Sequence, residues 1–123
     1  MTEDLGGRPM LEGRNVLIVE DRYLIAAELA DGVRRLGGHV LGPSPSLVAA
    51  YAMIDQDVHL GLLDVNLDGE LVFPLAEALV ARGVPILFLT GYEVDTLPFR
   101  WRDAPRLTKP ITDDGLSDAL QNL

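Results

Sequence analysis

Apolar residues along the chain alternate between short continuous runs and stretches with helical spacing. Residues 15–19, which read NVLIV, form a run of strand length, typical of a strand buried on both faces of a parallel sheet. From residue 22 onward the apolar positions recur every three or four residues, at Ile25, Leu29, Val33 and Leu36, which predicts a helix. The glycine pair at residues 37–38 is expected to end this helix.

The same alternation continues to the end of the chain. Further strands are predicted at residues 39–42, 58–63, 84–89 and 107–108. Helices are predicted at residues 47–54, 71–81 and 113–123, with Ser46 as the cap of the first and Gly83 as the stop of the second. Alternating strands and helices predict an α/β fold, a doubly wound parallel sheet with helices on both faces.

The fourth helix is predicted to depart from this regular pattern. Where it is expected, between Gly91 and Pro105, the chain carries Pro98 near the middle. A proline inside a helix lacks the backbone donor and clashes with the preceding turn. We therefore expect the fourth helix to be short, frayed or disordered.

The chain is predicted to hold one domain. Residues 1–13 are polar, contain glycine and have no period, so we expect a flexible N-terminal tail. Residues 14–123 carry the alternating pattern without a linker, a repeat or a low-complexity tract. This length is enough for a single domain with a sizeable core.

Composition and charge narrow the range of functions. Hydrophobic residues make up 48% of the chain and charged residues 24%, a balance typical of a globular protein. There is no cysteine, so neither a disulfide nor a thiolate metal site is available. No signal-peptide pattern and no apolar run of about 18 residues is present, so we expect a cytoplasmic location and no membrane span. The net charge of −9 argues against binding nucleic acid.

Five polar residues stand at the ends of the predicted strands: Glu20, Asp21, Asp64, Thr90 and Lys109. In an open parallel sheet, ligands bind beyond the carboxyl ends of the strands. Each of these residues alone is weak evidence, because a lone aspartate after a strand is commonly a helix cap and a lone lysine is commonly solvated. Their joint arrangement predicts one site that combines three carboxylates, a hydroxyl and an ammonium.

The chemistry of this set indicates a divalent cation. Two carboxylates about 4 Å apart repel by roughly 4 kcal/mol at an effective dielectric constant of about 20, and one lysine does not neutralise three acids. Oxygen ligands without histidine or cysteine favour Mg²⁺, with Mn²⁺ as a substitute. Such a site is suited to transfer of a phosphoryl group to a carboxylate.

Four segments resemble the receiver domains of bacterial two-component response regulators. They read VLIVED (residues 16–21), LLDVNL (62–67), LTG (89–91) and LTKP (107–110). The resemblance covers residues 14–123. It implies a flavodoxin-like sheet of five strands in the order 2-1-3-4-5, and phosphorylation by a histidine kinase or a phosphotransfer protein.

The resemblance also implies a role for each residue of the metal site. Asp64 is expected to be the phospho-acceptor. Asp21 and Asp64 are expected to bind Mg²⁺ directly and Glu20 through water, and the backbone carbonyl of Asn66 is expected to complete the protein's ligands.

Other residues are expected to contact the phosphoryl group. Thr90 and Lys109 would each bind one of its oxygens, and the Lys109–Pro110 bond is expected to be cis. Asn66 and Tyr92, two residues beyond the acceptor and the threonine, are expected to tune the lifetime of the phosphorylated state.

The segment FLTGY (residues 88–92) is similar to the F-x-T-G-Y subclass of receivers, in which the fourth helix is reduced or mobile. One departure concerns Arg106, which stands where receivers usually carry an aromatic residue that moves with the threonine. Two alternatives could transmit phosphorylation to a partner in place of that aromatic residue. Residues 92–105 could change between ordered and disordered states, or Tyr92 or Phe99 could be the residue that moves.

Several further residues have competing interpretations. The apolar residues of the predicted fourth-helix segment either pack in the core or, together with an arginine, form a surface for a protein partner. His39 and His59 are interpreted as structural residues of strands. The candidate partner surface comprises Leu97, Phe99, Trp101 and Arg106.

The favoured function is a signalling switch without an output domain, which acts on a protein partner or as a phosphate sink. It would catalyse only its own phosphorylation and dephosphorylation, as a monomer or a weak phosphorylation-dependent dimer. One alternative is a pseudo-receiver that binds partners without phosphorylation. Another is a small magnesium-dependent phosphatase, although Asn66 stands where such enzymes usually carry a second aspartate.

Overall fold

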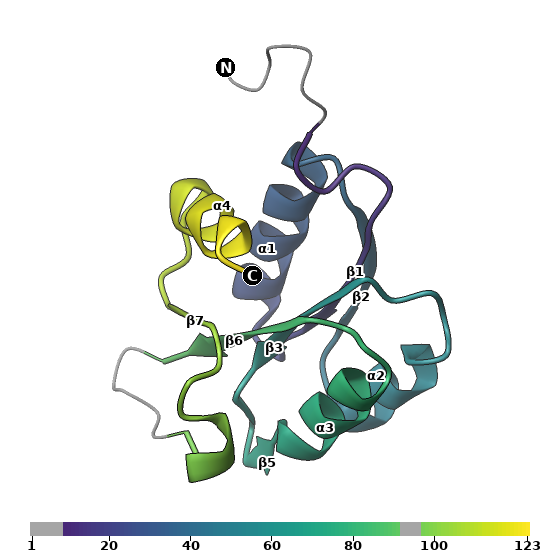
Figure 1. The fold of residues 1–123 in the computed structure, drawn as a ribbon, viewed down its shortest axis with the longest axis vertical. Helices are drawn as coiled ribbons and strands as arrows, with labels where there is room; N and C mark the ends of the chain where they lie inside the picture. Colours follow the sequence, from purple (N-terminus) through teal and green to yellow (C-terminus); the bar gives the residue numbers. More distant parts are fainter. Residues whose placement is uncertain (1–8, 92–96) are drawn as a thin grey trace.

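A five-stranded parallel sheet forms the centre of the molecule (Figure 1). The computed structural model describes residues 9–91 and 97–123. The strand order is β2-β1-β3-β6-β7, and every pair is parallel. This is the flavodoxin-like order that the resemblance implies. The strands are β1 (Asn15–Val19), β2 (His39–Ser44), β3 (Leu60–Asp64), β6 (Ile86–Thr90) and β7 (Arg106–Thr108).

Helices cover both faces of this sheet, as the alternating pattern predicts. In Figure 1, α1 and α4 lie on one side of the strands and α2 and α3 lie on the other. The four helices are α1 (Tyr23–Arg35), α2 (Leu47–Met53), α3 (Phe73–Ala81) and α4 (Asp113–Gln121).

The two faces of the sheet give two separate hydrophobic clusters. Successive strand residues alternate between them: Leu17 and Leu63 belong to the cluster under α2 and α3, whereas Ile18 and Leu62 belong to the cluster under α1 and α4. All four side chains are fully buried. Burial of a leucine or isoleucine side chain contributes roughly 1.5–3 kcal/mol. Burial on both faces explains why the central strands read as continuous apolar runs.

Two helices begin at capping residues. The Ser46 hydroxyl accepts a hydrogen bond from the Ala49 N–H at 3.2 Å, so the predicted cap of α2 is confirmed. The Thr112 hydroxyl accepts from the Gly115 N–H at 2.9 Å at the start of α4. Each bond satisfies a backbone donor that the helix itself leaves free.

A small hairpin after β3 was not predicted from the sequence. Strands β4 (Asn66–Leu67) and β5 (Glu70–Leu71) pair antiparallel, and α3 therefore begins two residues later than the predicted residue 71. A turn at Asp68 and Gly69 joins the two strands, with φ of 51° and 96°. The Asn66 side-chain oxygen accepts from the Gly69 N–H at 2.7 Å and stabilises this turn.

In the described part of the segment between β6 and β7, the helical structure is a single 3-10 turn, η1 (Phe99–Trp101). The turn begins directly after Pro98, which agrees with the prediction of a reduced fourth helix. Trp101 is 6% exposed and packs edge-on against Phe88, with ring centroids 5.4 Å apart. The turn is therefore attached to the core under α2 and α3.

The prediction of a flexible tail at residues 1–13 is wrong for residues 9–13. Residues 1–8 lie outside the described residues, but Leu11 is 5% exposed and belongs to the cluster under α1. Its N–H donates to the Leu36 carbonyl at 2.8 Å. Residues 9–13 thus form a turn that packs against the domain, because Leu11 finds an apolar neighbour that the local sequence does not reveal.

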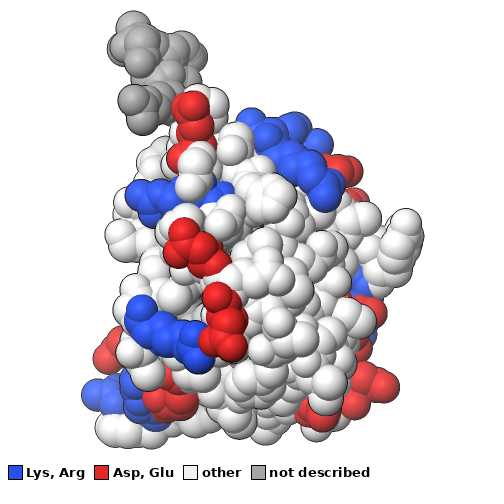
Figure 2. Space-filling view, turned by 90° about the vertical axis from the view of Figure 1, so that its right-hand side faces the viewer, with Lys and Arg blue, Asp and Glu red and all other residues white. Residues whose placement is uncertain are grey.

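Figure 2 shows a broad uncharged area between separate groups of acidic and basic side chains on one face. Helix α2 contributes no charged side chain, and its Val48 is 80% exposed. Over residues 9–91 and 97–123, no helix is both long enough and apolar enough to cross a membrane.

Candidate functional site

The predicted site residues lie together at the carboxyl end of the sheet. Glu20 and Asp21 follow β1, Asp64 ends β3, Thr90 ends β6 and Lys109 follows β7. Because β1, β3, β6 and β7 are successive neighbours, their ends form one continuous rim. At the rim, the Val65 N–H donates to the Leu89 carbonyl at 3.2 Å and joins β3 to β6, and the Lys109 N–H donates to the Thr90 carbonyl at 3.0 Å and joins β6 to β7.

Three carboxylates meet at this rim. One oxygen from each of Glu20, Asp21 and Asp64 lies within 4.8 Å of the others. Glu20 is 1% exposed and Asp64 is 5% exposed, so two of the three acids are buried. The Arg22 N–H donates to Glu20 Oε2 at 3.1 Å and fixes this carboxylate at the start of α1.

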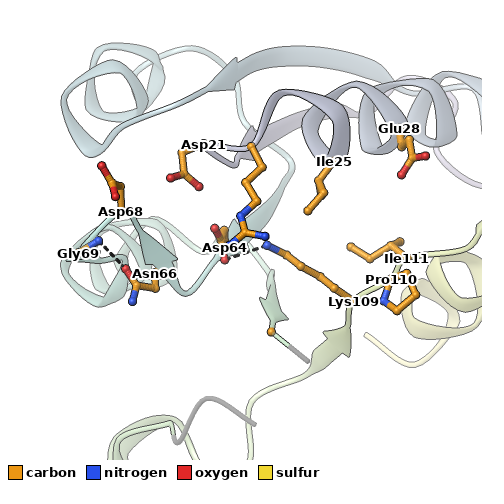
Figure 3. A pocket seen from close by; sticks show the side chains of 12 residues that line it. Asp21, Ile25, Glu28, Asp64, Asn66, Asp68, Gly69, Lys109, Pro110 and Ile111 are labelled. Atoms are coloured by element: carbon orange, nitrogen blue, oxygen red, sulfur yellow. Dashed lines mark hydrogen bonds and ion pairs between the residues drawn. The ribbon is translucent and has the colours of Figure 1, made fainter. Parts of the chain in front are cut away.

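Lys109 supplies the positive charge of the cluster. Its Nζ lies 2.8 Å from Glu20 Oε1 and 3.3 Å from Asp64 Oδ1. The ammonium therefore bridges the two buried acids, and Figure 3 shows the Lys109 side chain reaching across the cavity to Asp64. One ammonium among three carboxylates leaves an excess of negative charge, which a divalent cation would offset.

Burial, followed by the nearby charge of Glu20, raises the pKa of Asp64 to about 7. Lys109 and a hydrogen bond from the Asn66 N–H act in the opposite direction. Without a cation, the Asp64 carboxyl therefore retains a proton for part of the time near neutral pH. This is the behaviour of a site with too few positive charges.

The acidic cluster opens into a cavity of about 700 Å³. In Figure 3, Asp21, Ile25 and Glu28 lie on one side of the cavity and Lys109 and Ile111 on the other, with Asp64 between them. The lining residues are Asp21, Arg22, Ile25, Glu28, Asp64, Asn66, Asp68, Gly69, Gly91, Lys109, Pro110 and Ile111.

The donor set fits Mg²⁺ or Mn²⁺. Within the described part of the chain, the three clustered acids offer only oxygen ligands, and neither histidine nor cysteine joins them. Hard oxygen donors and an open cavity suit a cation that retains waters and shares its coordination with a phosphoryl group. Asn66 lines the same cavity, as its predicted backbone contact requires.

Thr90 has a different environment from the acids. It is 4% exposed, and its hydroxyl lies 3.4 Å from the hydroxyl of Thr108 on the neighbouring strand β7. The Lys109–Pro110 bond is cis, as predicted. Tyr92, predicted to tune the phosphoryl lifetime, lies outside the described residues.

The predicted partner surface is wrong for two of its four residues. Leu97 is 7% exposed and Trp101 is 6% exposed, and both pack in the core under α2 and α3, as the competing interpretation held. Phe99 is 77% exposed, with the Arg102 guanidinium 3.8 Å from the centre of its ring. Arg106 is also exposed and donates to the Arg102 carbonyl at 2.6 Å.

His59 lies directly before β3 and not within a strand as expected, but its structural role is supported, since its Nδ1 accepts from the Asn15 N–H at 2.8 Å. Sequence analysis did not identify Arg22 and Thr108 as neighbours of the site. Arg22 directly follows Asp21, and this position could have indicated it. The contact between Thr108 and Thr90 depends on the register of two strands and has no local sequence signal.

Comparisons with known proteins identify related chains, although no family model matches. The chain is 41% identical to SdrG from Sphingomonas melonis Fr1. The match covers 91% of this chain and 95% of the SdrG chain, and the two structures superpose with a TM-score of 0.81. A structure of the BeF3-activated conformation of SdrG, from Pseudomonas melonis Fr1, gives 37% identity, coverage of 93% and 95%, and a TM-score of 0.74.

Two further relatives connect the chain to signalling proteins. It is 32% identical over 118 residues to the sensory transduction protein LytT of Bacillus subtilis (strain 168), matching 86% of this chain but only 46% of LytT. The chain thus spans about half of LytT. It is 28% identical to the signal receiver domain of a modulated diguanylate cyclase from Desulfovibrio desulfuricans G20, with a TM-score of 0.70 and coverage of 88% and 90%. With the fold and the strand-end site, these similarities show that the chain belongs to the receiver domains of bacterial response regulators.

Proposed function

We propose that the protein is a magnesium-dependent phosphorylation switch in which Asp64 accepts a phosphoryl group from a histidine kinase or a phosphotransfer protein. The observation that carries this proposal is the buried pair of carboxylates bridged by Lys109 at the mouth of an acidic cavity. Such a cluster stabilises the fold poorly, because desolvation of the charges opposes their attraction. Its position at the strand ends is instead suited to chemistry.

Asp64 is the best placed of the three acids to act as the nucleophile. It lines the cavity and lies 3.3 Å from the Lys109 ammonium. Glu20 is 1% exposed and does not line that cavity. Asp21 lines the cavity but makes no ion pair with the side chains of residues 9–91 and 97–123.

In the proposed reaction, a carboxylate oxygen of Asp64 attacks the phosphorus of a phosphohistidine. The new O–P bond forms as the N–P bond breaks, and the electron pair of that bond stays on the leaving imidazole. The Lys109 ammonium stabilises negative charge on the phosphoryl oxygens. The Thr90 hydroxyl donates a hydrogen bond to one of these oxygens in the product.

Asp21 and Asp64 would hold Mg²⁺ directly, with Glu20 acting through water and Asn66 through its backbone carbonyl. When bound, the cation would neutralise the acids and the phosphoryl oxygens. Mn²⁺ satisfies the same oxygen donors and is the expected substitute. That SdrG has a BeF3-activated conformation supports this assignment, since the two chains are 37% identical in that comparison.

The proposal extends to the cellular role. The protein would catalyse only its own phosphorylation and dephosphorylation, and would act in the cytoplasm through a downstream protein or as a phosphate sink. Nucleic acid and membranes are not expected partners, given a net charge of −9. A monomer or a weak phosphorylation-dependent dimer is the expected assembly.

The proposal is tested by incubation of the protein with acetyl phosphate and Mg²⁺, followed by intact-mass measurement. We expect one added phosphoryl group, whose incorporation is prevented by chelation of Mg²⁺ and by Asp64→Asn. Asp68→Asn is the matched control, because Asp68 lines the same cavity but is exposed and outside the cluster. Labelling that persists in Asp64→Asn would show that another residue is the acceptor.

A further inference from the structure

Thr90 and Thr108 form a cross-strand pair at the ends of β6 and β7. The register places them directly opposite each other, so both side chains lie on the same face of the sheet. Their hydroxyl oxygens are 3.4 Å apart. The Lys109 N–H donates to the Thr90 carbonyl at 3.0 Å and keeps the two strand ends together.

The hydroxyl of Thr90 needs a hydrogen-bond partner because Thr90 is only 4% exposed. Within the described residues, its side-chain partner is Thr108. The contact is long for two hydroxyl groups, and Thr108 is exposed to solvent. The pair is therefore weak enough to separate when a stronger acceptor becomes available.

The strand order places Thr108 and Asp64 on opposite sides of Thr90. Strand β6 lies between β3, which ends at Asp64, and β7, which ends at Thr108. Either hydroxyl can be the donor in the contact between Thr90 and Thr108. In both cases, rotation of the Thr90 side chain toward a phosphoryl group on Asp64 moves its oxygen away from Thr108 and breaks the contact.

We infer that Thr108 is a positioning residue that holds the Thr90 hydroxyl on the β7 side of the site until Asp64 is phosphorylated. This inference rests on the proposed function, since it assigns a competitor to the contact that Thr90 makes with the phosphoryl group. Thr108 thereby sets the balance between the resting and phosphorylated forms. It acts through Thr90 and needs no contact with the phosphoryl group itself.

Affinity for beryllofluoride, a phosphoryl mimic, measures this balance directly in the presence of Mg²⁺. Thr108→Val keeps the shape of the side chain and removes the competing hydroxyl. We expect its affinity for beryllofluoride to rise about two- to tenfold, the range expected for loss of one modest hydrogen bond. Thr108→Ser retains a hydroxyl and should remain close to the unsubstituted protein.

A double-mutant cycle separates this role from a general structural effect. In Thr90→Val the hydroxyl that Thr108 holds is absent, so adding Thr108→Val should leave the remaining affinity unchanged. An equal gain in both backgrounds would show that Thr108 acts on the site by another route and would overturn the inference. Circular dichroism of each variant confirms that the comparison is made on folded protein.

The experiment also separates this inference from the proposed function. If the unsubstituted protein does not bind beryllofluoride with Mg²⁺, both the phospho-acceptor assignment and the inference fail. If it binds, but Thr108→Val has the same or lower affinity, the phospho-acceptor assignment stands and the role of Thr108 is rejected.

Discussion

Asp64 is both buried and able to carry a negative charge, and burial disfavours the charged form. It is buried beside a second buried acid, Glu20, and the Lys109 ammonium that it contacts is shared between them. Burial of Asp64 and the charge of Glu20 raise the pKa of Asp64 to about 7. The site therefore retains an unfavourable charge until a cation or a proton binds.

This balance predicts the effect of Asp64→Asn on stability. The folded-state pKa lies above the ordinary value of 3.8, so Asp64 lowers the free energy of unfolding progressively as pH rises from about 4 to 7. The asparagine does not titrate, and without divalent cations at pH 7.5 it should be more stable by roughly 1–3 kcal/mol.

Urea unfolding with a chelator at pH 5 and pH 7.5 measures this difference. The advantage of Asp64→Asn should be larger at the higher pH, and Asp68→Asn should change little at either. An advantage that is equal at both pH values would contradict the assigned charge effect.

At the residue scale, the sequence predicted the site because each functional residue follows an apolar strand. Glu20, Asp64 and Lys109 each stand at the end of a predicted strand, their joint arrangement indicated one site, and the sheet brings them together. The hydroxyl pair of Thr90 and Thr108 could not be predicted in the same way. Its members are 18 residues apart, and only the register of β6 against β7 places them opposite each other.

Individual elements were predictable where their apolar residues form a continuous run or recur at helical spacing. The central strands are continuous apolar runs because both of their faces are buried. The hairpin of β4 and β5 was missed because two-residue strands have no period, and Leu71 was assigned to the following helix. The burial of Leu11 was missed for a related reason, since it depends on packing against residues that are distant in sequence.

The environments of the apolar residues in the segment before β7 were also not predictable from the sequence, because some of these residues are buried and others are exposed. Trp101 is 6% exposed, packs against Phe88 and has the Arg100 guanidinium 4.2 Å from the centre of its ring. Phe99, two residues earlier, is 77% exposed. Sequence alone could not assign one of them to the core and the other to the surface.

Substitution of these two aromatic residues tests this difference. Trp101→Ala removes a large buried ring and should lower the free energy of unfolding by about 3–5 kcal/mol. Phe99→Ala, made in the same turn, should change it by less than about 1 kcal/mol, because the ring is already solvated. Urea denaturation followed by circular dichroism measures both values. Equal losses would mean that η1 is not attached to the core through Trp101.

At the scale of the whole molecule, the order of the strands creates the site. The acids come from β1 and β3 and the lysine from the end of β7, so residues 20 and 109 meet although most of the chain separates them. The molecule also carries a net charge of −9. A cation could therefore stabilise it in two ways, by binding at the carboxylate cluster or by general screening of the surface.

Thermal unfolding with Mg²⁺ separates binding from screening. A cation that binds only the folded state at a hundred times its dissociation constant adds about 2.7 kcal/mol to the free energy of unfolding. Asp21→Asn should remove most of this gain, because Asp21 supplies one of the three clustered oxygens. Asp103→Asn makes the same change in net charge at a side chain that is 90% exposed, and should retain the gain. NaCl at equal ionic strength gives the screening contribution. If Mg²⁺ stabilises both variants equally, and no more than NaCl does, the acidic cluster is not a metal site.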